Sequence, residues 1–326
     1  MKETQVDVRP PADANAKARN VRRVERLLMK GEVSKATAAA WGPAAARSSS
    51  DTAAAFRQQQ VVGGREPMEP ATGPAATATD SLQADVAQHL QSTWAKTPNG
   101  SGAGAQGDRF EHWTPLELHA QNAPRTAELL GRLAGGAVPE QILDLVLAGR
   151  LSGLEKKDGG TRVLSCGTIP RRLVGKAVCQ VRKDEIAEAV GPHSYGVGMP
   201  AGAEALHKTS SAKSEEMPGH AFISLDARHA FVKVRRRKVI QCLEARNPDL
   251  AALARQWYDR DSKHVVGGAG SAARIVEQLH GLDQGCPLSP AFFAIALAPA
   301  LEDILTFAKA IDERAGCSHT SMTYIL

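Results

Sequence analysis

Apolar residues recur at helical spacing through the second two thirds of the chain. The stretches TAELLGRLAGG (126–136) and PEQILDLVLAGR (139–150) each predict an amphipathic helix. RRRKVIQCLEARNPDLAALARQWY (235–258) predicts a helix that is interrupted at its Asn-Pro step. GLDQGCPLSPAFFAIALAPALEDI (281–304) predicts a tight loop followed by an apolar helix.

Two stretches have the pattern of β-strands. In RLSGLEKKDGGTRVLSC (150–166), two short runs flank the turn KKDGG, which predicts a hairpin with a glycine-rich tip. AFISLDARHAF (221–231) sets a mostly apolar, strand-like run in front of a single carboxylate, Asp226. Strands mixed with helices in unequal blocks predict an α+β fold.

The first 110 residues differ in character from the rest. RNVRRVERLLMKG (19–31) places valines and leucines on one helical face and arginines on the other, and SKATAAAW (34–41) predicts a second helix. We therefore predict a basic helical segment over 1–42, which either touches nucleic acid or docks on the protein. Residues 43–110 are rich in Ala, Gly, Ser, Thr, Pro and Gln, and they predict a low-complexity, largely disordered linker with one candidate helix near 80–95. The globular part is expected over 111–326.

Composition narrows the functional classes. The 326 residues are 43% apolar but only 4% aromatic, so the core is expected to be small for the length. The five cysteines are scattered without zinc-ligand spacing, which argues against a structural metal. Their odd number, together with the lack of a signal peptide, favours an intracellular location, nuclear or cytoplasmic. The apolar run PAFFAIALAPAL (290–301) is too short to span a bilayer, so no membrane partner is expected.

Positive charge is concentrated in one block of an otherwise nearly neutral chain. The net charge is +5. Residues 150–182 contain two acidic side chains and eight basic ones, Arg150, Lys156, Lys157, Arg162, Arg171, Arg172, Lys176 and Arg182. Such a block indicates either a polyanionic partner such as nucleic acid or a solvated charged face.

Four segments bear on the chemistry, and three of them have a structural alternative. Asp226 could bind Mg²⁺ together with substrate phosphates, or it could cap the following helix. Lys156, Lys157 and Arg162 could fold over a triphosphate, or they could mark an exposed hairpin tip. The glycines of SYGVGMPAGAEALHK (194–208) fit neither the dinucleotide fingerprint nor the Walker spacing.

The loop GLDQGCPLSP (281–290) is the fourth segment. Gly285 and Pro287 predict a sharp turn, and Gln284 offers an amide to a base edge or to the backbone. Ser289-Pro290 predicts the start of the apolar helix. In isolation the loop is also compatible with a purely structural role.

Taken in order, these segments resemble the reverse transcriptases of non-LTR retrotransposons. KKDGGTR with IPRRLVGKAV is similar to the fingers hairpin and the helix that follows it, and GVGMPAGAEALHK to a glycine-rich segment between fingers and palm. FISLDARHAF resembles the first palm motif, and GLDQGCPLSPAFFAIALAPAL the template-gripping loop and helix. The alanine-rich style and RRVERLLMKGEVSKA resemble the spliced-leader-associated retroelements of trypanosomatids.

The resemblance implies a right-hand polymerase whose fingers and incomplete palm occupy 111–326. It implies an RNA-directed DNA polymerase that uses an RNA template, a DNA primer, deoxynucleoside triphosphates and two Mg²⁺ ions. Asp226 would be the catalytic metal ligand, and Phe231 would exclude a 2′-hydroxyl. The nucleotide phosphates would contact Lys156, Lys157 and Arg162. Template and primer would contact Gln284, Gly285, Pro287, Arg171 and Arg172.

The sequence also departs from the family pattern. His229 and Val232 stand where the family commonly has Asn and Asp or Asn, and no Asp-Asp pair follows the template-gripping helix before Leu326. One carboxylate cannot hold two metal ions roughly 3.5–4 Å apart. We therefore expect a truncated reading frame or fragment that is inactive alone. The alternatives are a non-catalytic nucleic-acid-binding remnant, a degenerate retroelement product, or an unrelated interaction protein.

Overall fold

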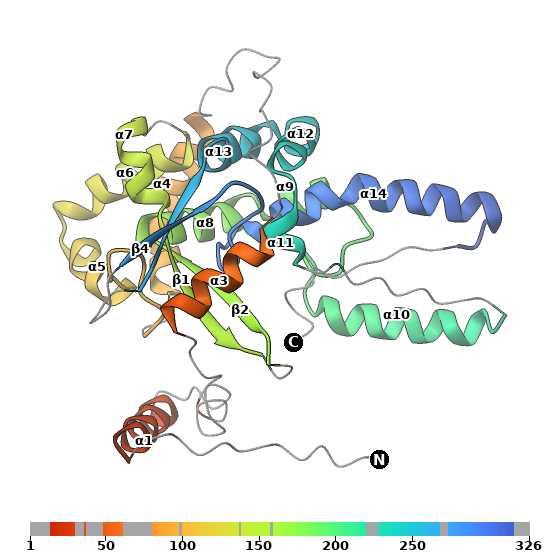
Figure 1. The fold of residues 1–326 in the computed structure, drawn as a ribbon. Helices are drawn as coiled ribbons and strands as arrows, with labels where there is room; N and C mark the ends of the chain where they lie inside the picture. The colour runs from red at the N-terminus through yellow and green to blue at the C-terminus, as the bar shows by residue number, and fades with distance from the viewer. Residues whose placement is uncertain are drawn as a thin grey trace.

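The fold combines many helices with one small sheet (Figure 1). The computed structural model describes residues 14–29, 36, 48–60, 80–97, 100–136, 138–156, 159–219, 227, 229–267 and 273–315. The helices before the sheet are α1 (Ala14–Met29), α3 (Ser49–Gln59), α4 (Asp80–Ala95), α5 (Phe110–Leu118), α6 (Asn122–Ala134) and α7 (Glu140–Leu147). The later helices are α8 (Ile169–Val181), α9 (Lys183–Val190), α10 (Gly202–Glu216), α11 (Ala230–Lys233), α12 (Arg236–Arg246), α13 (Pro248–Tyr258) and α14 (Ser289–Ile311). The mixture of helix and strand agrees with the predicted class.

Within the described residues, the sheet has four strands in the order β2-β1-β3-β4. β1 (Gly149–Glu155) and β2 (Thr161–Gly167) form the predicted antiparallel hairpin, in which Leu154 faces Arg162. Its turn closes with a bond from the Lys156 N–H to the Gly160 carbonyl oxygen at 2.8 Å. β3 (Ser262–Val266) runs parallel to β1 and antiparallel to β4 (Arg274–Gln278). The sheet therefore joins the hairpin to a segment about a hundred residues further along the chain.

Helix α3 covers one face of this sheet. Ala53 and Phe56 are buried and pack against Leu151, Val163 and other apolar side chains of the strands. A side-chain bond also ties the helix to the hairpin, since Gln59 Nε2 donates to the Thr161 carbonyl oxygen at 3.2 Å. The predicted largely disordered linker over 43–110 is therefore wrong for 49–59, where apolar burial stabilises an ordered helix.

The candidate helix near 80–95 is confirmed as α4, and it belongs to the main core. Leu82, Val86, Leu90 and Trp94 repeat every four residues and are almost fully buried. They line one face of α4, which packs against α6 and α8. The helix was predicted, but its packing in the core was not, because the low-complexity composition around it conceals a regular apolar stripe.

Helix α1 confirms the first N-terminal helix, beginning somewhat earlier than expected. Its apolar face is poorly covered, with Val21 49% and Leu28 52% exposed. The second predicted helix, 34–41, lies outside the described residues except for Ala36, which is helical and buried.

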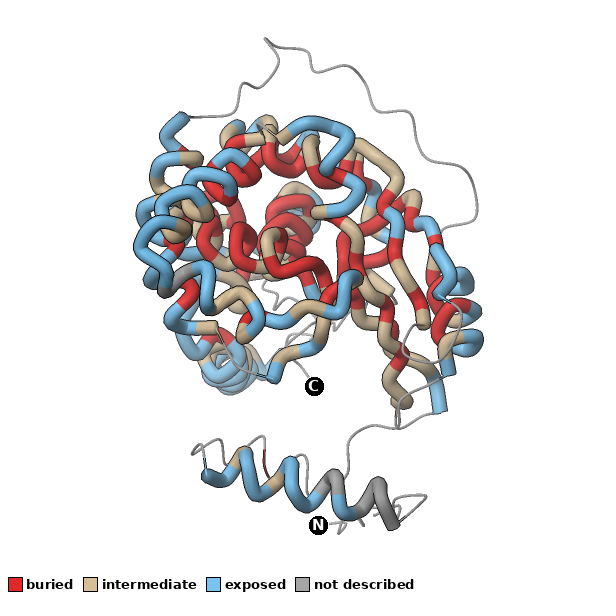
Figure 2. Tube along the Cα trace, turned by 90° about the vertical axis from the view of Figure 1, so that its left-hand side faces the viewer, coloured by how far each residue is buried: buried red, intermediate tan, exposed pale blue. Residues whose placement is uncertain are grey.

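The predicted interruption near residue 247 is also present. Asn247 ends α12 and caps α13, because its side-chain oxygen accepts a bond from the Leu250 N–H at 3.1 Å. Pro248 occupies the first turn, where its missing N–H costs no hydrogen bond. The two helices pack on each other and bury Leu243 and Trp257 completely. In Figure 2 the buried residues, drawn in red, gather on the inside of the helical part, and the exposed residues, drawn in pale blue, lie around its outside.

Helix α14 is longer than the sequence pattern predicted. It runs for 23 residues, and by length and composition it is the one described helix that could cross a membrane. The prediction that its apolar run is too short is therefore wrong, because the helix continues past Leu301. Its first half is packed in the core, with Phe292 and Ile295 fully buried, whereas Phe307 in the second half is 71% exposed. Length and composition alone thus do not assign it to a membrane.

Candidate nucleic-acid interface

The loop formed by residues 281–288 lies directly on the hairpin strand β2. The Ser165 N–H donates to the Gln284 carbonyl oxygen at 2.7 Å. Gly285 has φ +128°, and a Cβ at this position would lie 2.5 Å from the Ser165 carbonyl oxygen. Only glycine combines this backbone angle with so close an approach. The predicted sharp turn is thus present, and it meets the edge of the sheet.

The other side of the loop rests on helix α8. A Cβ at Gly175 would lie 3.4 Å from the Pro287 ring, so helix and proline are in van der Waals contact. The loop closes where α14 begins, because the Ser289 hydroxyl donates to the Asp283 carbonyl oxygen at 2.8 Å. Gln284 is partly exposed and Gly285 is exposed. Pro287 is also partly exposed, so a bound strand could reach all three predicted template contacts of the loop.

A charged cluster is buried behind the loop. Asp283 is 2% exposed and forms an ion pair with Arg171 of α8, which is 1% exposed. The Asp283 Oδ1 atom also lies 3.2 Å from Nε2 of His264 in β3, which is fully buried. Arg171 donates further bonds to the Leu147 carbonyl oxygen at 2.9 Å and to the Tyr258 hydroxyl at 3.0 Å.

Arg236 holds the first residue of the same loop. Its Nε donates to the Gly281 carbonyl oxygen at 2.8 Å. Its two terminal nitrogens donate to the Arg260 carbonyl oxygen at 2.6 Å and to the Ser262 hydroxyl at 2.9 Å. The side chain is 4% exposed, so a second buried guanidinium links α12, β3 and the loop.

Burial and neighbouring charges have opposite effects on the pKa values of Asp283 and Arg171. Burial by itself raises the pKa of Asp283, but Arg171 and His264 outweigh it and hold that pKa below the usual range. Burial lowers the pKa of Arg171, and the attraction of Asp283 more than restores it, so its pKa lies above the ordinary value. For Arg236, burial prevails and lowers the pKa to about 10. Asp283 and Arg171 are therefore held in their charged forms.

The predicted phosphate-binding residues lie on the hairpin. Lys156 and Arg162 are both partly exposed at its tip and on its returning strand. Lys157 and the predicted metal ligand Asp226 lie outside the described residues. Contact of the hairpin residues with a triphosphate stays a prediction.

Phe231 lies beside the loop rather than on an open surface. It is 8% exposed, and its ring centroid is 5.0 Å from that of Phe293 in α14. Its carbonyl oxygen accepts a bond from the Leu282 N–H at 2.7 Å. The structure thus brings Phe231 next to the predicted template loop, while its contact with a sugar stays a prediction.

The arginine pair at the start of α8 divides between the inside and the surface. Arg171 was predicted to contact template or primer, but it is buried and paired with Asp283, so in this structure it cannot reach a strand. Arg172 is half-buried, with its guanidinium 4.4 Å from the Phe110 ring centroid. Arg182 also points inward, to Asp85 at 2.6 Å. The basic block therefore does not form one continuous basic surface.

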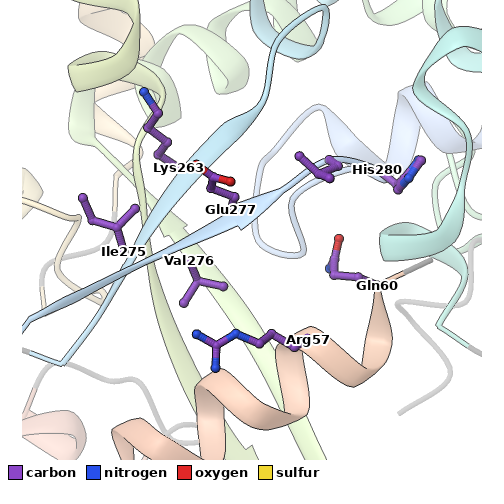
Figure 3. A pocket seen from close by; sticks show the side chains of 8 residues that line it. Arg57, Gln60, Lys263, Ile275, Val276, Glu277 and His280 are labelled. Carbon is purple, nitrogen blue, oxygen red and sulfur yellow. The ribbon is translucent and has the colours of Figure 1, made fainter. Parts of the chain in front are cut away.

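Neither a metal-ligand cluster nor the pocket between α3 and β4 coincides with the loop in the described part of the chain. Among the described residues, no group of three or more His, Cys, Asp or Glu side chains could hold a metal ion. A pocket of about 710 Å³ lies between α3 and the edge strand β4, at the opposite end of the sheet from β2 (Figure 3). It is lined by Arg57, Gln60, Lys263, Ile275, Val276, Glu277, Leu279 and His280. Lys263 is engaged by Asp144 at 2.7 Å, so its charge is already matched.

Sequence reasoning missed the partners of the loop. Asp283 stands in the quoted motif, but His264 and Arg236 carry no local signal that relates them to it. Arg171 did carry a local signal of burial, because it shares a helical face with the buried Val174 and Val178.

Part of the chain matches a known protein family. Residues 154–325 match the family model described as reverse transcriptase (RNA-dependent DNA polymerase). The matched region begins at the hairpin and includes α8 and the loop with its buried cluster. No curated protein matches the chain.

Proposed function

The chain belongs to the reverse transcriptase (RNA-dependent DNA polymerase) family, and from that premise we propose that it is the reverse-transcriptase-like domain of a non-LTR retroelement. In this proposal the β1–β2 hairpin and α8 are fingers elements, and α14 with its preceding loop belongs to the palm. The RNA template and the growing duplex contact the surface formed by the hairpin and the loop 281–288. The family implies an RNA template and deoxynucleoside triphosphates as substrates.

One observation carries the proposal. The bond between Ser165 and Gln284 joins the hairpin to the loop, so the two motifs that resemble polymerase sites form one surface. Exposed Gly285 presents bare backbone there, and Gln284 adds an amide that can pair with a base edge. Lys156 and Arg162 place positive charge on the same hairpin, where phosphates would bind with strong salt dependence.

Mg²⁺ is the metal that the family generally uses, and the described residues contain no cluster that fits it. The resemblance assigns Asp226 as one ligand, and the 326 residues contain no Asp-Asp pair to join it. We assign no chemical step to the metal from these residues. We propose that these 326 residues bind template and primer but do not transfer nucleotides alone.

Binding is tested by fluorescence anisotropy with a labelled RNA template annealed to a DNA primer, over a series of salt concentrations. The affinity should fall as salt rises, because phosphate contacts release counterions. Arg162→Gln should weaken binding at low salt by about 1 kcal/mol, the usual order for one surface charge near a phosphate. The matched control is Arg132→Gln, an exposed arginine on α6 paired with Glu128. Equal affinities for both variants, or binding indifferent to salt, would contradict the proposed surface.

Catalysis is tested separately by primer extension with Mg²⁺ and a homopolymer template. The expected result is no extension above an Asp226→Ala variant, together with measurable duplex binding. Extension above that variant would refute the proposed inactivity while leaving the family function intact. Lack of both extension and binding would instead favour a degenerate product over a nucleic-acid-binding domain.

A further inference from the structure

Adjacent residues of the loop 281–288 differ sharply in their environment. Gln284 and Gly285 reach the surface, whereas the side chain of the preceding Asp283 is almost fully buried. A loop can turn without a buried charge, and burying one is costly unless it is paired and hydrogen-bonded. The charge in this loop therefore needs an explanation beyond the turn itself.

The loop is fixed at both ends by groups from separate parts of the chain. Arg236 of α12 binds the Gly281 carbonyl oxygen, and Arg171 of α8 binds the Asp283 carboxylate. Pro287 at the other end contacts α8 at Gly175. Between these anchors, the exposed part meets the sheet at Ser165, through the hydrogen bond to Gln284 and the close approach of Gly285.

His264 connects the carboxylate to that contact. Its Nε2 lies 3.2 Å from Asp283 Oδ1 and 2.8 Å from Gln278 Oε1, and both of these atoms are acceptors. Nε2 therefore carries the proton, and Nδ1 faces the Ser165 hydroxyl at 3.4 Å. The Ser165 N–H in turn bonds the Gln284 carbonyl oxygen. Asp283, His264, Ser165 and Gln284 thus form a closed ring of contacts that spans the loop and two strands.

We propose that Asp283 is a positioning residue for template binding: through Arg171 and His264 it holds Gln284 and Gly285 in register on β2. The consequence for template binding rests on the proposed function, whereas the positioning itself does not.

The energetics of buried ion pairs support a geometric role. Replacing a buried pair by apolar residues of similar volume is often neutral or stabilising, so such a pair is a weak source of stability. The partners of Asp283, however, approach the carboxylate from two separate elements, Arg171 on α8 and His264 on β3. Apolar side chains would fill the same space without fixing the direction of the next backbone carbonyl. Stability and loop position can therefore be separated by mutation.

The test uses the full chain with Arg171→Met, Asp283→Leu and the double variant. Each single variant should lower the melting temperature, because it leaves one buried charge without its partner. The double variant should recover most of that loss. Hydrogen exchange at the Ser165 amide should nevertheless be about tenfold faster than in the natural sequence, the order expected when one hydrogen bond is weakened. The control amide is Leu130 in α6, which is buried and lies far from the loop in sequence.

Affinity for the labelled RNA–DNA duplex gives the functional readout. The double variant should bind about tenfold more weakly than the natural sequence although its melting temperature is restored. If the folded double variant protects the Ser165 amide from hydrogen exchange as well as the natural sequence does, the positioning role is overturned. If Ser165 protection is lost but affinity is unchanged, the link to template binding is overturned.

Two further results remain decisive. If the natural chain binds no duplex, the proposed function fails, and Ser165 exchange still decides the positioning role. If the double variant does not fold, Asp283→Asn replaces it, because this change removes the charge while nearly keeping the shape. Faster Ser165 exchange with unchanged Leu130 exchange would then support the role, and equal protection of Ser165 would refute it.

Discussion

The contact between loop and hairpin makes a quantitative prediction for Gly285→Ala. The new Cβ would lie 2.5 Å from the Ser165 carbonyl oxygen, so backbone must move, and the residue would sit at φ +128°. Strain of this kind costs about 1–3 kcal/mol. Moving the loop also weakens the bond from Ser165 to Gln284, worth about 1 kcal/mol. The total expected loss in the free energy of unfolding is about 2–4 kcal/mol.

The assay is equilibrium unfolding in urea, followed by circular dichroism. Gly136→Ala is the matched control, because Gly136 also has a positive φ, +78°, but a Cβ there would meet nothing within 4 Å. Gly136→Ala should lower the free energy of unfolding by about 1 kcal/mol, because alanine is strained in the left-handed backbone conformation. A loss at Gly285 no larger than the loss at Gly136 would refute the close approach of the loop to β2.

Three further predictions test the core, the cluster and a helix cap. Phe292→Ala should cost about 3–5 kcal/mol because the ring is fully buried, whereas Phe307→Ala, 71% exposed, should change stability by less than about 0.5 kcal/mol in the same urea assay. Because the pKa of Asp283 is lower in the folded chain than in the unfolded chain, its charge stabilises the fold above about pH 4, and this contribution is lost as the pH falls through the folded pKa. The urea midpoint of the natural chain should therefore fall more steeply between pH 5 and pH 3 than that of Asp283→Asn; parallel curves would contradict the shift. Asn247→Ala should lower stability by about 1 kcal/mol through loss of the cap of α13, and an unchanged melting curve would show that the cap contributes nothing.

Local patterns predicted much of the fold. The KKDGG turn identified the hairpin, and the Asn-Pro step located the junction between α12 and α13. These features depend on turn and cap chemistry within a few residues, which a single sequence contains. Composition did not predict helix α3, because its alanine-rich sequence is typical of a linker. Its single large apolar residue, Phe56, was enough to dock it on the sheet.

The candidate site was predicted only in part. Gln284, Gly285 and the hairpin were identified, and the structure brings them together. The buried cluster was not predicted, because Arg171 and Asp283 are 112 residues apart and their pairing depends on the tertiary fold. The resemblance implied that Arg171 contacts template or primer, which requires an exposed side chain. Arg171 is instead buried, because it lies on the inward face of α8.

The central claim is that template RNA binds where the loop 281–288 meets the β1–β2 hairpin. It is tested most directly by photocrosslinking a template that carries 4-thiouridine within the primer-paired segment, followed by mass spectrometry of the crosslinked peptides. The account predicts crosslinks to peptides that contain Gln284 or residues 156–167, and their loss in the Gly285→Ala variant at equal protein folding. Crosslinks confined to α1, or to the pocket residues between α3 and β4, would contradict it.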